Sequence, residues 1–218
     1  MTDLVGLVRE ALLRRAPAAL PGAEALSAYL HLVLEANEGI NLVSRRESTP
    51  GSLVGRHLLD ALEALPMLPP PGARPGRLLD IGSGAGFPGL PIKIARPELT
   101  VTLLEAKRKK INFLKQVILL LHLSHIAIVH GRIEMVVSEN QCGGFDMVIA
   151  RAFAKLETVL KLGHPLLRTG GQLIAMKGRE GDKELITVRA LMSSLSMKVV
   201  KKVELQLPET DKKRGLFF

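Results

Sequence analysis

Apolar and polar positions divide the chain into two parts with different periods. In the first part, apolar residues recur every three or four positions, as they do along one face of a helix. This spacing predicts three helices, over 3–15, 23–37 and 53–65. The proline-rich segment 66–76 then ends the helical pattern. We therefore expect an N-terminal helical extension over 1–65 and a connection over 66–76.

From residue 77 onward, short apolar runs alternate with amphipathic helical segments. The short runs predict strands over 77–81, 100–105, 126–131, 145–150, 170–178, 197–205 and the C-terminal RGLFF. Helices are predicted over 88–95, 107–122, 156–167 and 182–195. Such alternation forms a mostly parallel sheet that is covered by helices on both faces. Residues 77–218 are therefore expected to form one compact α/β domain.

Length and composition fit a globular protein of the cell interior. A chain of 218 residues buries roughly 70% of its unfolded surface, which is enough for one substantial core. No apolar run approaches the roughly 20 residues that cross a bilayer. The single cysteine excludes an internal disulfide, and the N-terminal segment lacks the apolar centre of a signal peptide. We expect a monomeric, cytoplasmic protein that does not bind a membrane.

The charge narrows the choice of partner. Thirty Lys and Arg residues against 21 Asp and Glu give a net charge of +9. This excess favours a polyanion, because each neutralised phosphate releases counterions, although a solvated basic surface has the same composition. With no Trp, one Tyr and six Phe, a broad base-stacking platform for single strands is not expected. Nucleic acid is the favoured partner.

A glycine-rich segment, DIGSGAGFPG, follows the first predicted strand, where α/β folds bind ligands. The dinucleotide fingerprint Gly-x-Gly-x-x-Gly, counted from Gly82, requires a third glycine where Phe87 stands, and it fits only from Gly84. An acid followed by alternating glycines fits without displacement, from Asp80 through Gly82, Gly84 and Gly86. That pattern resembles the first motif of class I methyltransferases, which bind S-adenosylmethionine. A tight turn without a ligand remains the alternative.

Acidic residues at the following strand ends suit a nucleoside. Glu105 ends the second predicted strand, where an acid accepts hydrogen bonds from both ribose hydroxyls in NAD and S-adenosylmethionine enzymes alike. Ile133 and Glu134 follow the third strand, where an adenine would lie against an apolar and a polar group. The alternative for Glu105 is a surface acid that faces the basic run from Lys107 to Lys110, and Glu134 taken alone is more often a helix-start acid. The histidines show no metal-ligand pattern, so no metal is expected.

Longer segments resemble one family. DIGSGAGFPGLPIKIARPELTVTLLE, KRKKINFLKQV, GRIE, ARAFAKL and AMKG, with NLVS and RHLLD before them, are similar to the bacterial 16S ribosomal RNA guanine-N7 methyltransferases, also called glucose-inhibited division protein B. The likeness covers roughly residues 35–180. It implies a class I, S-adenosylmethionine-dependent fold with a Rossmann-like, seven-stranded, mostly parallel sheet. The implied acceptor is the guanine at position 527 in the 530 loop, in 16S ribosomal RNA or the small ribosomal subunit.

The resemblance also implies site residues. The family's cofactor positions fall here on Gly82, Phe87, Ile133, Glu134 and Arg151, and Glu105 fits the ribose role. RNA contacts are expected near the strand ends and in the extension, at Lys177, Arg45, Arg46 and Arg56. No general base is expected, because guanine N7 has an in-plane lone pair. An RNA-binding ribosome-assembly factor without activity and an NAD(P) oxidoreductase remain as alternatives.

Overall fold

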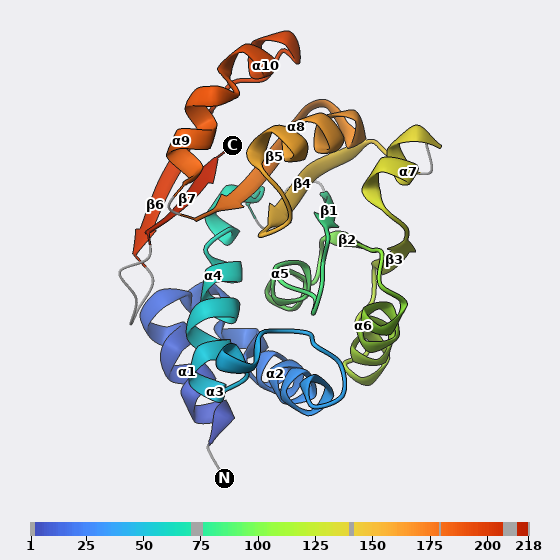
Figure 1. Cartoon of the computed structure of the whole chain (residues 1–218). Helices are drawn as coiled ribbons and strands as arrows, with labels where there is room; N and C mark the ends of the chain where they lie inside the picture. Colours follow the sequence, from blue (N-terminus) through green and yellow to red (C-terminus); the bar gives the residue numbers. More distant parts are fainter. Residues whose placement is uncertain (1–2, 71–75, 140–141, 179, 207–212, 218) are drawn as a thin grey trace.

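One sheet organises the chain in the computed structural model, which describes residues 3–70, 76–139, 142–178, 180–206 and 213–217 (Figure 1). The sheet has seven strands in the order β3-β2-β1-β4-β5-β7-β6. They are β1 (Arg77–Ile81), β2 (Thr100–Glu105), β3 (Ile126–His130), β4 (Phe145–Arg151), β5 (Leu167–Lys177), β6 (Lys202–Gln206) and β7 (Lys213–Phe217). Strands β1 to β5 pair in parallel, and β7 is antiparallel to both β5 and β6. The predicted α/β fold with a mostly parallel sheet is confirmed.

Helices precede the sheet and connect its strands. The N-terminal part contains α1 (Leu4–Arg15), α2 (Ala23–Asn37), α3 (Pro50–Ser52) and α4 (Leu59–Leu62), and a π-helical stretch over Leu53–Leu58 joins the last two. The sheet part contains α5 (Gly89–Ala95), α6 (Arg108–Leu120), α7 (Ile133–Ser138), α8 (Leu156–Gly163), α9 (Gly181–Thr187) and α10 (Arg189–Ser194). Short 3-10 turns lie over Pro17–Gly22, Arg45–Glu47, Leu65–Met67 and His164–Leu166.

Several predicted boundaries differ from the structure, and local chemistry accounts for two of them. The helix predicted over 156–167 ends at Gly163, because Pro165 has no N–H to continue the helical ladder. The strand predicted over 197–205 begins only at Lys202. Ser196 has a φ of +54°, and the Met197 N–H donates to the Met192 carbonyl at 2.8 Å, which is a Schellman-type helix end.

Other differences have weaker signals in the sequence. The segment predicted as one helix over 182–195 is divided into α9 and α10 at Val188. Thr187 precedes the break, and its hydroxyl donates to the Glu184 carbonyl at 2.7 Å, which competes with the backbone ladder. The short helix α7 was not predicted, although Glu134 was recognised as an acid suited to a helix start.

Two hydrophobic clusters lie on opposite faces of the sheet. Because strand side chains alternate, Leu78 belongs to the cluster with α5 and α6, and Leu79 to the cluster with α7 and α8. Helices α1, α2 and α4 join the first cluster, in which Tyr29 and Leu30 are fully buried. Figure 1 shows α2 and α4 beside α5, and α1 packs against α2 and α4, so the extension covers one face of the sheet. Within the described residues, no helix is long and apolar enough to cross a membrane.

Candidate active site

The glycine loop connects β1 to α5 at the carboxyl end of the sheet. The N–H groups of Gly82 and Ser83 both donate to the Leu104 carbonyl in β2, at 2.9 and 3.1 Å. Gly82 and Gly84 have φ values of +70° and +62°, in the left-handed region that favours glycine. β1 lies between β2 and β4, where the strand order reverses. The loop therefore lies where open α/β sheets bind their ligands.

Glu105 closes the side of the loop toward β2. It is the last residue of β2 and is 7% exposed. Its Oε2 accepts a hydrogen bond from the Gly84 N–H at 2.9 Å, and its Oε1 accepts one from the Lys107 N–H at 2.8 Å. Each carboxylate oxygen has two lone pairs, so both oxygens retain capacity for a further donor. The backbone thus fixes this carboxylate and leaves it able to bind hydroxyl groups.

A pocket of about 420 Å³ lies between the glycine loop and the ends of β2, β3 and β4. This volume is within the range of small-molecule sites. Four of the predicted cofactor residues line it, namely Gly82, Glu105, Ile133 and Glu134. The part of the chain that the structure describes contains no group of three or more His, Cys, Asp or Glu residues able to hold a metal ion.

The pocket also has lining residues that were not among the predicted cofactor residues. Arg132, Ala152 and Phe153 line the pocket, as do Lys107 and Lys110 from the start of α6. Lys107, Arg132, Ala152 and Phe153 lie one or two positions after the ends of β2, β3 or β4, and Lys110 lies in the first turn of α6. Their position after strand ends was the available signal, because these ends meet at one edge of a parallel sheet.

Phe87 and Arg151, the other two predicted cofactor residues, lie on the core side of the loop. The Phe87 side chain is 4% exposed, and its ring centroid is 5.2 Å from the centroids of both Tyr29 and His57. The guanidinium carbon of Arg151 lies 5.3 Å from the centre of the Phe87 ring. Neither residue is part of the described lining of the pocket. In this structure both residues pack between the glycine loop and the N-terminal helices, on the side of the loop away from the pocket.

Arg151 joins the end of β4 to the N-terminal helices. Its Nη1 donates to Asp60 Oδ2 at 2.9 Å and to the Arg56 carbonyl at 3.3 Å. Its Nη2 lies 3.1 Å from His57 Nδ1. A guanidinium only donates hydrogen bonds, so His57 Nδ1 accepts and the ring proton is on Nε2, which lies 3.6 Å from Glu47 Oε2. This network ties the glycine-loop edge to the helical extension.

The alternation of β4 explains why Arg151 faces the extension. Met147 and Ile149 belong to the cluster that includes the N-terminal helices, and Arg151 follows them at the same period of two. The ion pair with Asp60 is buried, because the Asp60 side chain is 0% exposed and that of Arg151 only 11%. The alternation of side chains along β4 can be read from the sequence. The sequence does not indicate that Asp60, from the helical extension, provides the carboxylate that pairs with Arg151.

Two buried polar groups hold the inner side of the loop. The Tyr29 hydroxyl, from α2, donates to the Ala85 carbonyl at 2.9 Å, and burial raises the pKa of Tyr29 well above its usual value. Asp80 Oδ2 accepts from the Gly89 N–H at 3.1 Å, at the start of α5. Burial raises the pKa of Asp80 to about 7, against the hydrogen bond from Gly89, which lowers it. Asp80 therefore organises the loop from the core and does not enter the pocket.

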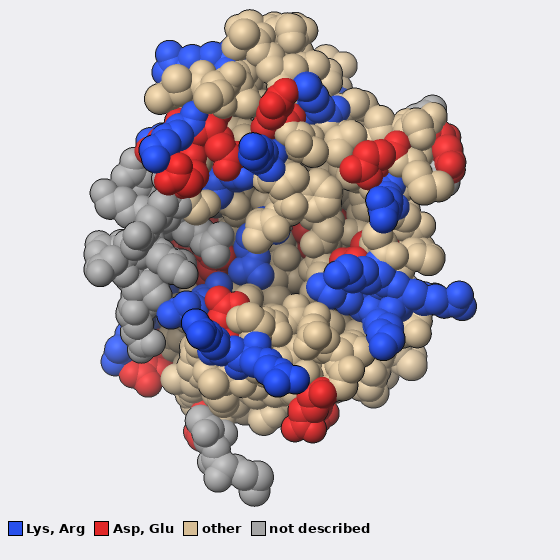
Figure 2. All heavy atoms as spheres, in the orientation of Figure 1, with Lys and Arg blue, Asp and Glu red and all other residues tan. Residues whose placement is uncertain are grey.

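Basic side chains flank the pocket edge on two sides. Figure 2 shows one group of Lys and Arg near β3 and the start of α6, a second over the N-terminal helices, and a hollow between them. Lys107 and Lys110, at the start of α6, line the pocket. Of the predicted RNA contacts, Arg45 and Arg46 are exposed in the turn after α2, and Arg56 is about one-third exposed.

Lys177 differs from the other predicted RNA contacts. Its Nζ donates to the Ala154 carbonyl at 2.7 Å and forms an ion pair with Glu184 Oε2 at 2.8 Å. The side chain is 12% exposed. Glu184 lies in α9, so this ion pair holds α9 against the end of β5. In this structure the ammonium is occupied by protein acceptors and is not presented to a phosphate.

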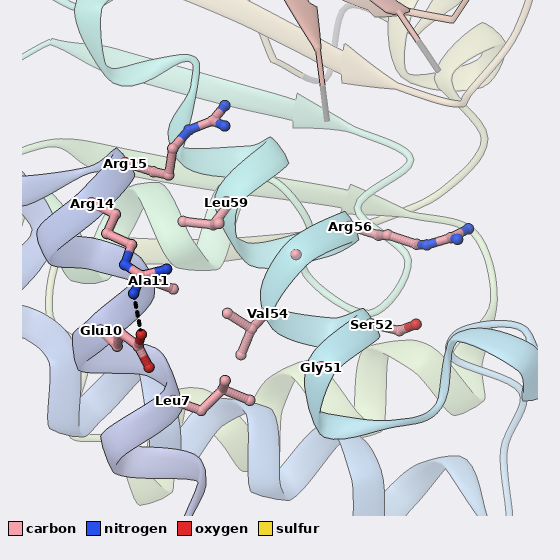
Figure 3. Close-up of a pocket in the computed structure, with 11 residues that line it drawn as sticks. Leu7, Glu10, Ala11, Arg14, Arg15, Gly51, Ser52, Val54, Arg56 and Leu59 are labelled. Carbon is pink, nitrogen blue, oxygen red and sulfur yellow. Dashed lines mark ion pairs between the residues drawn. The ribbon is translucent and has the colours of Figure 1, made fainter. Parts of the chain in front are cut away.

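A second cavity, of about 410 Å³, lies between α1 and the helical path from α3 to α4 (Figure 3). The cationic groups of α1 at its rim already have carboxylate partners. Arg14 pairs with Glu10 at 2.6 Å, and Arg15 with Glu63 at 2.9 Å. Figure 3 shows Arg56 directed away from α1. No described residue of the glycine loop or of the sheet lines this cavity, so it is separate from the site at the strand ends.

Comparison with known proteins agrees with this geometry. The model of the family described as rRNA small subunit methyltransferase G matches residues 22–213. The ribosomal RNA small subunit methyltransferase G of Syntrophus aciditrophicus is 40% identical over 181 residues, which cover 83% of this chain and 73% of that protein. The protein of the same name from Methylobacillus flagellatus is 37% identical over 195 residues, which cover 89% of this chain and 87% of that protein.

Solved structures support the fold alone. Fibrillarin from Aeropyrum pernix, crystallised with natively bound S-adenosylmethionine, has a TM-score of 0.55 at 14% identity and covers 73% of this chain and 74% of that chain. The ribosomal protein L11 methylase of Lactobacillus delbrueckii subsp. bulgaricus has a TM-score of 0.54 at 15% identity, and the match covers 75% of this chain and 78% of that chain.

Proposed function

Because the chain belongs to the rRNA small subunit methyltransferase G family, we propose that it transfers the methyl group of S-adenosylmethionine to N7 of a guanine in 16S ribosomal RNA. The observation that carries this proposal is that the glycine loop, Glu105 and the residues after β3 line one common pocket. The family likeness indicates the guanine at position 527 in the 530 loop. We further propose that the protein acts as a monomer in the cytoplasm.

The pocket residues fit S-adenosylmethionine. Glu105 retains acceptor capacity for the two ribose hydroxyls, and the apolar Ile133 with the adjacent Glu134 suits an adenine. A Cβ on Gly84 would lie in ordinary contact with Lys110 Nζ at 3.7 Å and with the Gly82 carbonyl oxygen at 3.8 Å, so a positive charge faces the region where the cofactor carboxylate would lie. When bound, the cofactor supplies a methyl group on a positively charged sulfur. Gly82, Gly84 and Lys110 would hold its amino-acid end.

Methyl transfer to N7 requires no proton transfer by the protein. N7 uses its lone pair to bond the methyl carbon, while the electrons of the broken carbon–sulfur bond remain on sulfur. The positive charge thereby passes to the purine, and no proton leaves N7. The protein contributes alignment of the three reacting atoms, and such alignment is worth roughly 7–11 kcal/mol. A carboxylate fixed by two backbone N–H groups, as Glu105 is, suits this role in positioning the cofactor.

The basic surface supports RNA as the acceptor. N7 lies on the edge of guanine that faces the major groove. In A-form RNA this groove is too deep and narrow for side chains to reach the base, so the target guanine must lie in a loop or leave its stack. Lys107 and Lys110 line the pocket, Arg45 and Arg46 are exposed in the extension, and Figure 2 shows basic groups on both sides of a hollow. Phosphates bound on both sides would hold the RNA strand across the pocket. We expect the affinity to fall steeply with salt.

Calorimetry and methyl transfer test the proposal together. We expect S-adenosylhomocysteine to bind and NAD not to bind, and labelled methyl groups to pass from S-adenosylmethionine to unmethylated 16S ribosomal RNA or to small subunits. Binding of NAD in place of S-adenosylhomocysteine would indicate an oxidoreductase. Binding of RNA without any methyl transfer would indicate an assembly factor, and either result would refute the proposed function.

A further inference from the structure

Phe153 differs from the other aromatic side chains in its exposure. It is 36% exposed, whereas Tyr29, Phe87, Phe113 and Phe145 are each at most 4% exposed. These five are the Phe and Tyr side chains whose burial the structure describes. The chain thus buries its other described rings in packed surroundings and presents this one to solvent, at the functional edge of the sheet.

The ring of Phe153 lies against the glycine loop, inside the candidate active site. It lines the same pocket as Gly82 and Glu105. Its Cδ2 lies only 2.6 Å from the position that a Cβ on Gly82 would take, so the absence of a side chain at Gly82 permits this approach. Phe153 follows β4, and Ile133 follows β3, with β1 and β2 between these strands. The ring is therefore at the end of the pocket opposite to the adenine residues.

The backbone before Phe153 is held in an uncommon conformation. Ala152 has a φ of +50°, in the left-handed region that non-glycine residues rarely adopt. The residue before it, Arg151, sends its side chain into the buried ion pair with Asp60. The turn at Ala152 thus separates an anchoring side chain on the core side from an exposed ring at the pocket. Such conformations persist where the surrounding structure fixes them, and they concentrate at functional sites.

We propose that Phe153 is the surface on which the target guanine stacks during methyl transfer. This inference rests on the proposed function. A guanine that leaves its own stack loses contacts with neighbouring bases, and an aromatic ring at the pocket replaces them. A single ring is also consistent with a chain that lacks a broad aromatic platform. Phe153 therefore acts as a substrate-contacting residue at the end of the pocket where the methyl group is expected.

The charge change during the reaction gives this ring a second role. Methylation turns the neutral purine into a cation, and the face of an aromatic ring attracts cations. The attraction grows as positive charge moves from sulfur to the purine. Phe153 therefore binds the transition state more strongly than it binds the unreacted base, and such differential binding accelerates the reaction. An aliphatic side chain of similar size provides contact but lacks this preference.

Phe153→Leu tests the stacking, because leucine keeps an apolar side chain but has no aromatic face. We expect kcat/KM for 16S ribosomal RNA to fall about 5- to 100-fold, with kcat itself reduced, and the affinity for S-adenosylhomocysteine to stay within about twofold. Phe153→Tyr should retain most of the turnover. Leu119→Ala is the matched control, because it truncates an apolar side chain on α6 that is 72% exposed, and its turnover should equal that of the wild type.

A spectroscopic experiment reads the contact without turnover. The chain has no Trp, so Phe153→Trp introduces a single tryptophan at the proposed contact. With S-adenosylhomocysteine bound, 7-methylguanosine monophosphate should quench its fluorescence more strongly than guanosine monophosphate does. Equal or absent quenching by the two nucleotides, or wild-type turnover by Phe153→Leu, would overturn the inference. A wild-type protein that transfers no methyl group to 16S ribosomal RNA would instead refute the function itself.

Discussion

The glycine loop has two halves that face different surroundings. In the first half, residues 82–84, the glycines border the pocket, and a Cβ on Gly84 would have its nearest neighbour at 3.7 Å. In the second half, residues 86–89, the glycines face the core. A Cβ on Gly89 would lie 2.7 Å from the Oδ2 of Asp80, a distance that real Cβ atoms do not show.

This difference shows that one sequence motif combines two requirements. The first half borders the pocket and, at Gly82, admits the Phe153 ring, whereas the second half lets α5 approach β1 closely enough for Asp80 to accept from the Gly89 N–H. The core half is supported further by Tyr29 and by the stack of Phe87 on Arg151. Substitutions in residues 86–89, or in the side chains packed against them, should therefore reduce stability. Substitutions in residues 82–84 should reduce cofactor binding.

Arg151→Ala should have the largest effect, because it removes the cation that compensates a buried carboxylate. Breaking a buried ion pair in this way costs about 3–5 kcal/mol of unfolding free energy. Arg168→Ala is the matched control, since the ion pair of Arg168 with Asp146 is at the surface and its side chain is 55% exposed, and it should cost less than about 1 kcal/mol. Urea unfolding measures both. Equal losses for the two variants would contradict the role of Arg151 as an anchor.

Gly89→Ala should lower the unfolding free energy by about 1–3 kcal/mol, because the added methyl group overpacks the space between α5 and β1. Gly84→Ala adds a methyl group that meets its neighbours only at ordinary contact distances, and it should cost about 1 kcal/mol for its left-handed conformation. Its affinity for S-adenosylhomocysteine should fall more than that of Gly89→Ala. Thermal unfolding and calorimetry on folded protein separate the two effects. The reverse order in affinity would show that the two halves are assigned wrongly.

Glu105→Gln should weaken S-adenosylhomocysteine binding about tenfold, or about 1.4 kcal/mol, because a neutral amide is a poorer acceptor and one of its ends only donates. The unfolding free energy should also fall by about 1–3 kcal/mol, because the NH2 end of the amide cannot accept from the backbone N–H that faces it, so binding is compared on folded protein. Glu24→Gln makes the same chemical change at the surface, where Glu24 pairs with Arg9 and is 79% exposed, and it should leave binding unchanged. Calorimetry distinguishes the variants, and wild-type affinity for Glu105→Gln would remove this carboxylate from the proposed site.

Asp80→Asn should have the smallest effect, visible as a dependence on pH. Burial raises the pKa of Asp80 to about 7, so between about pH 4 and pH 7 the folded chain holds a proton that the unfolded chain has released. The contribution of Asp80 to stability therefore falls as pH rises through this window. Relative to the wild type, Asp80→Asn should gain roughly 0.7 kcal/mol between pH 6.5 and 7.5. A difference that is constant over this range would argue against a raised pKa.

The sequence was sufficient for the parts of the site that depend on neighbours along the chain. The spacing from Asp80 to Gly86 placed the loop directly after β1, and Glu105 was expected at the end of β2, where it lies. Both inferences follow from the topology of parallel strands, which brings their carboxyl ends to one edge. Ile133 and Glu134 reach the same pocket for the same reason.

Contacts between distant segments were not predictable in this way. Asp60 meets Arg151 across 91 positions, and Tyr29 meets Ala85 across 56, because the extension packs on the same face of the sheet as α5. No periodicity in the sequence specifies which helix packs there. The same packing turns Phe87 and Arg151 toward the core, although a family motif alone does not show which side of the loop its residues face. Lys177 was predicted to contact RNA from the end of its strand, and its ion pair with Glu184 in α9 is a further contact that the sequence did not indicate.

The most direct test maps the methyl group on its acceptor. Small subunits from cells that lack this methylation, and naked 16S ribosomal RNA, are incubated with the protein and S-adenosylmethionine, and the RNA is then cleaved chemically at N7-methylguanine and read by primer extension. We predict one new stop, next to the guanine at position 527, that depends on the cofactor and is strongly reduced with Glu105→Gln at limiting cofactor. Methyl transfer without any N7-specific stop, or stops at guanines outside the 530 loop, would contradict the proposed function.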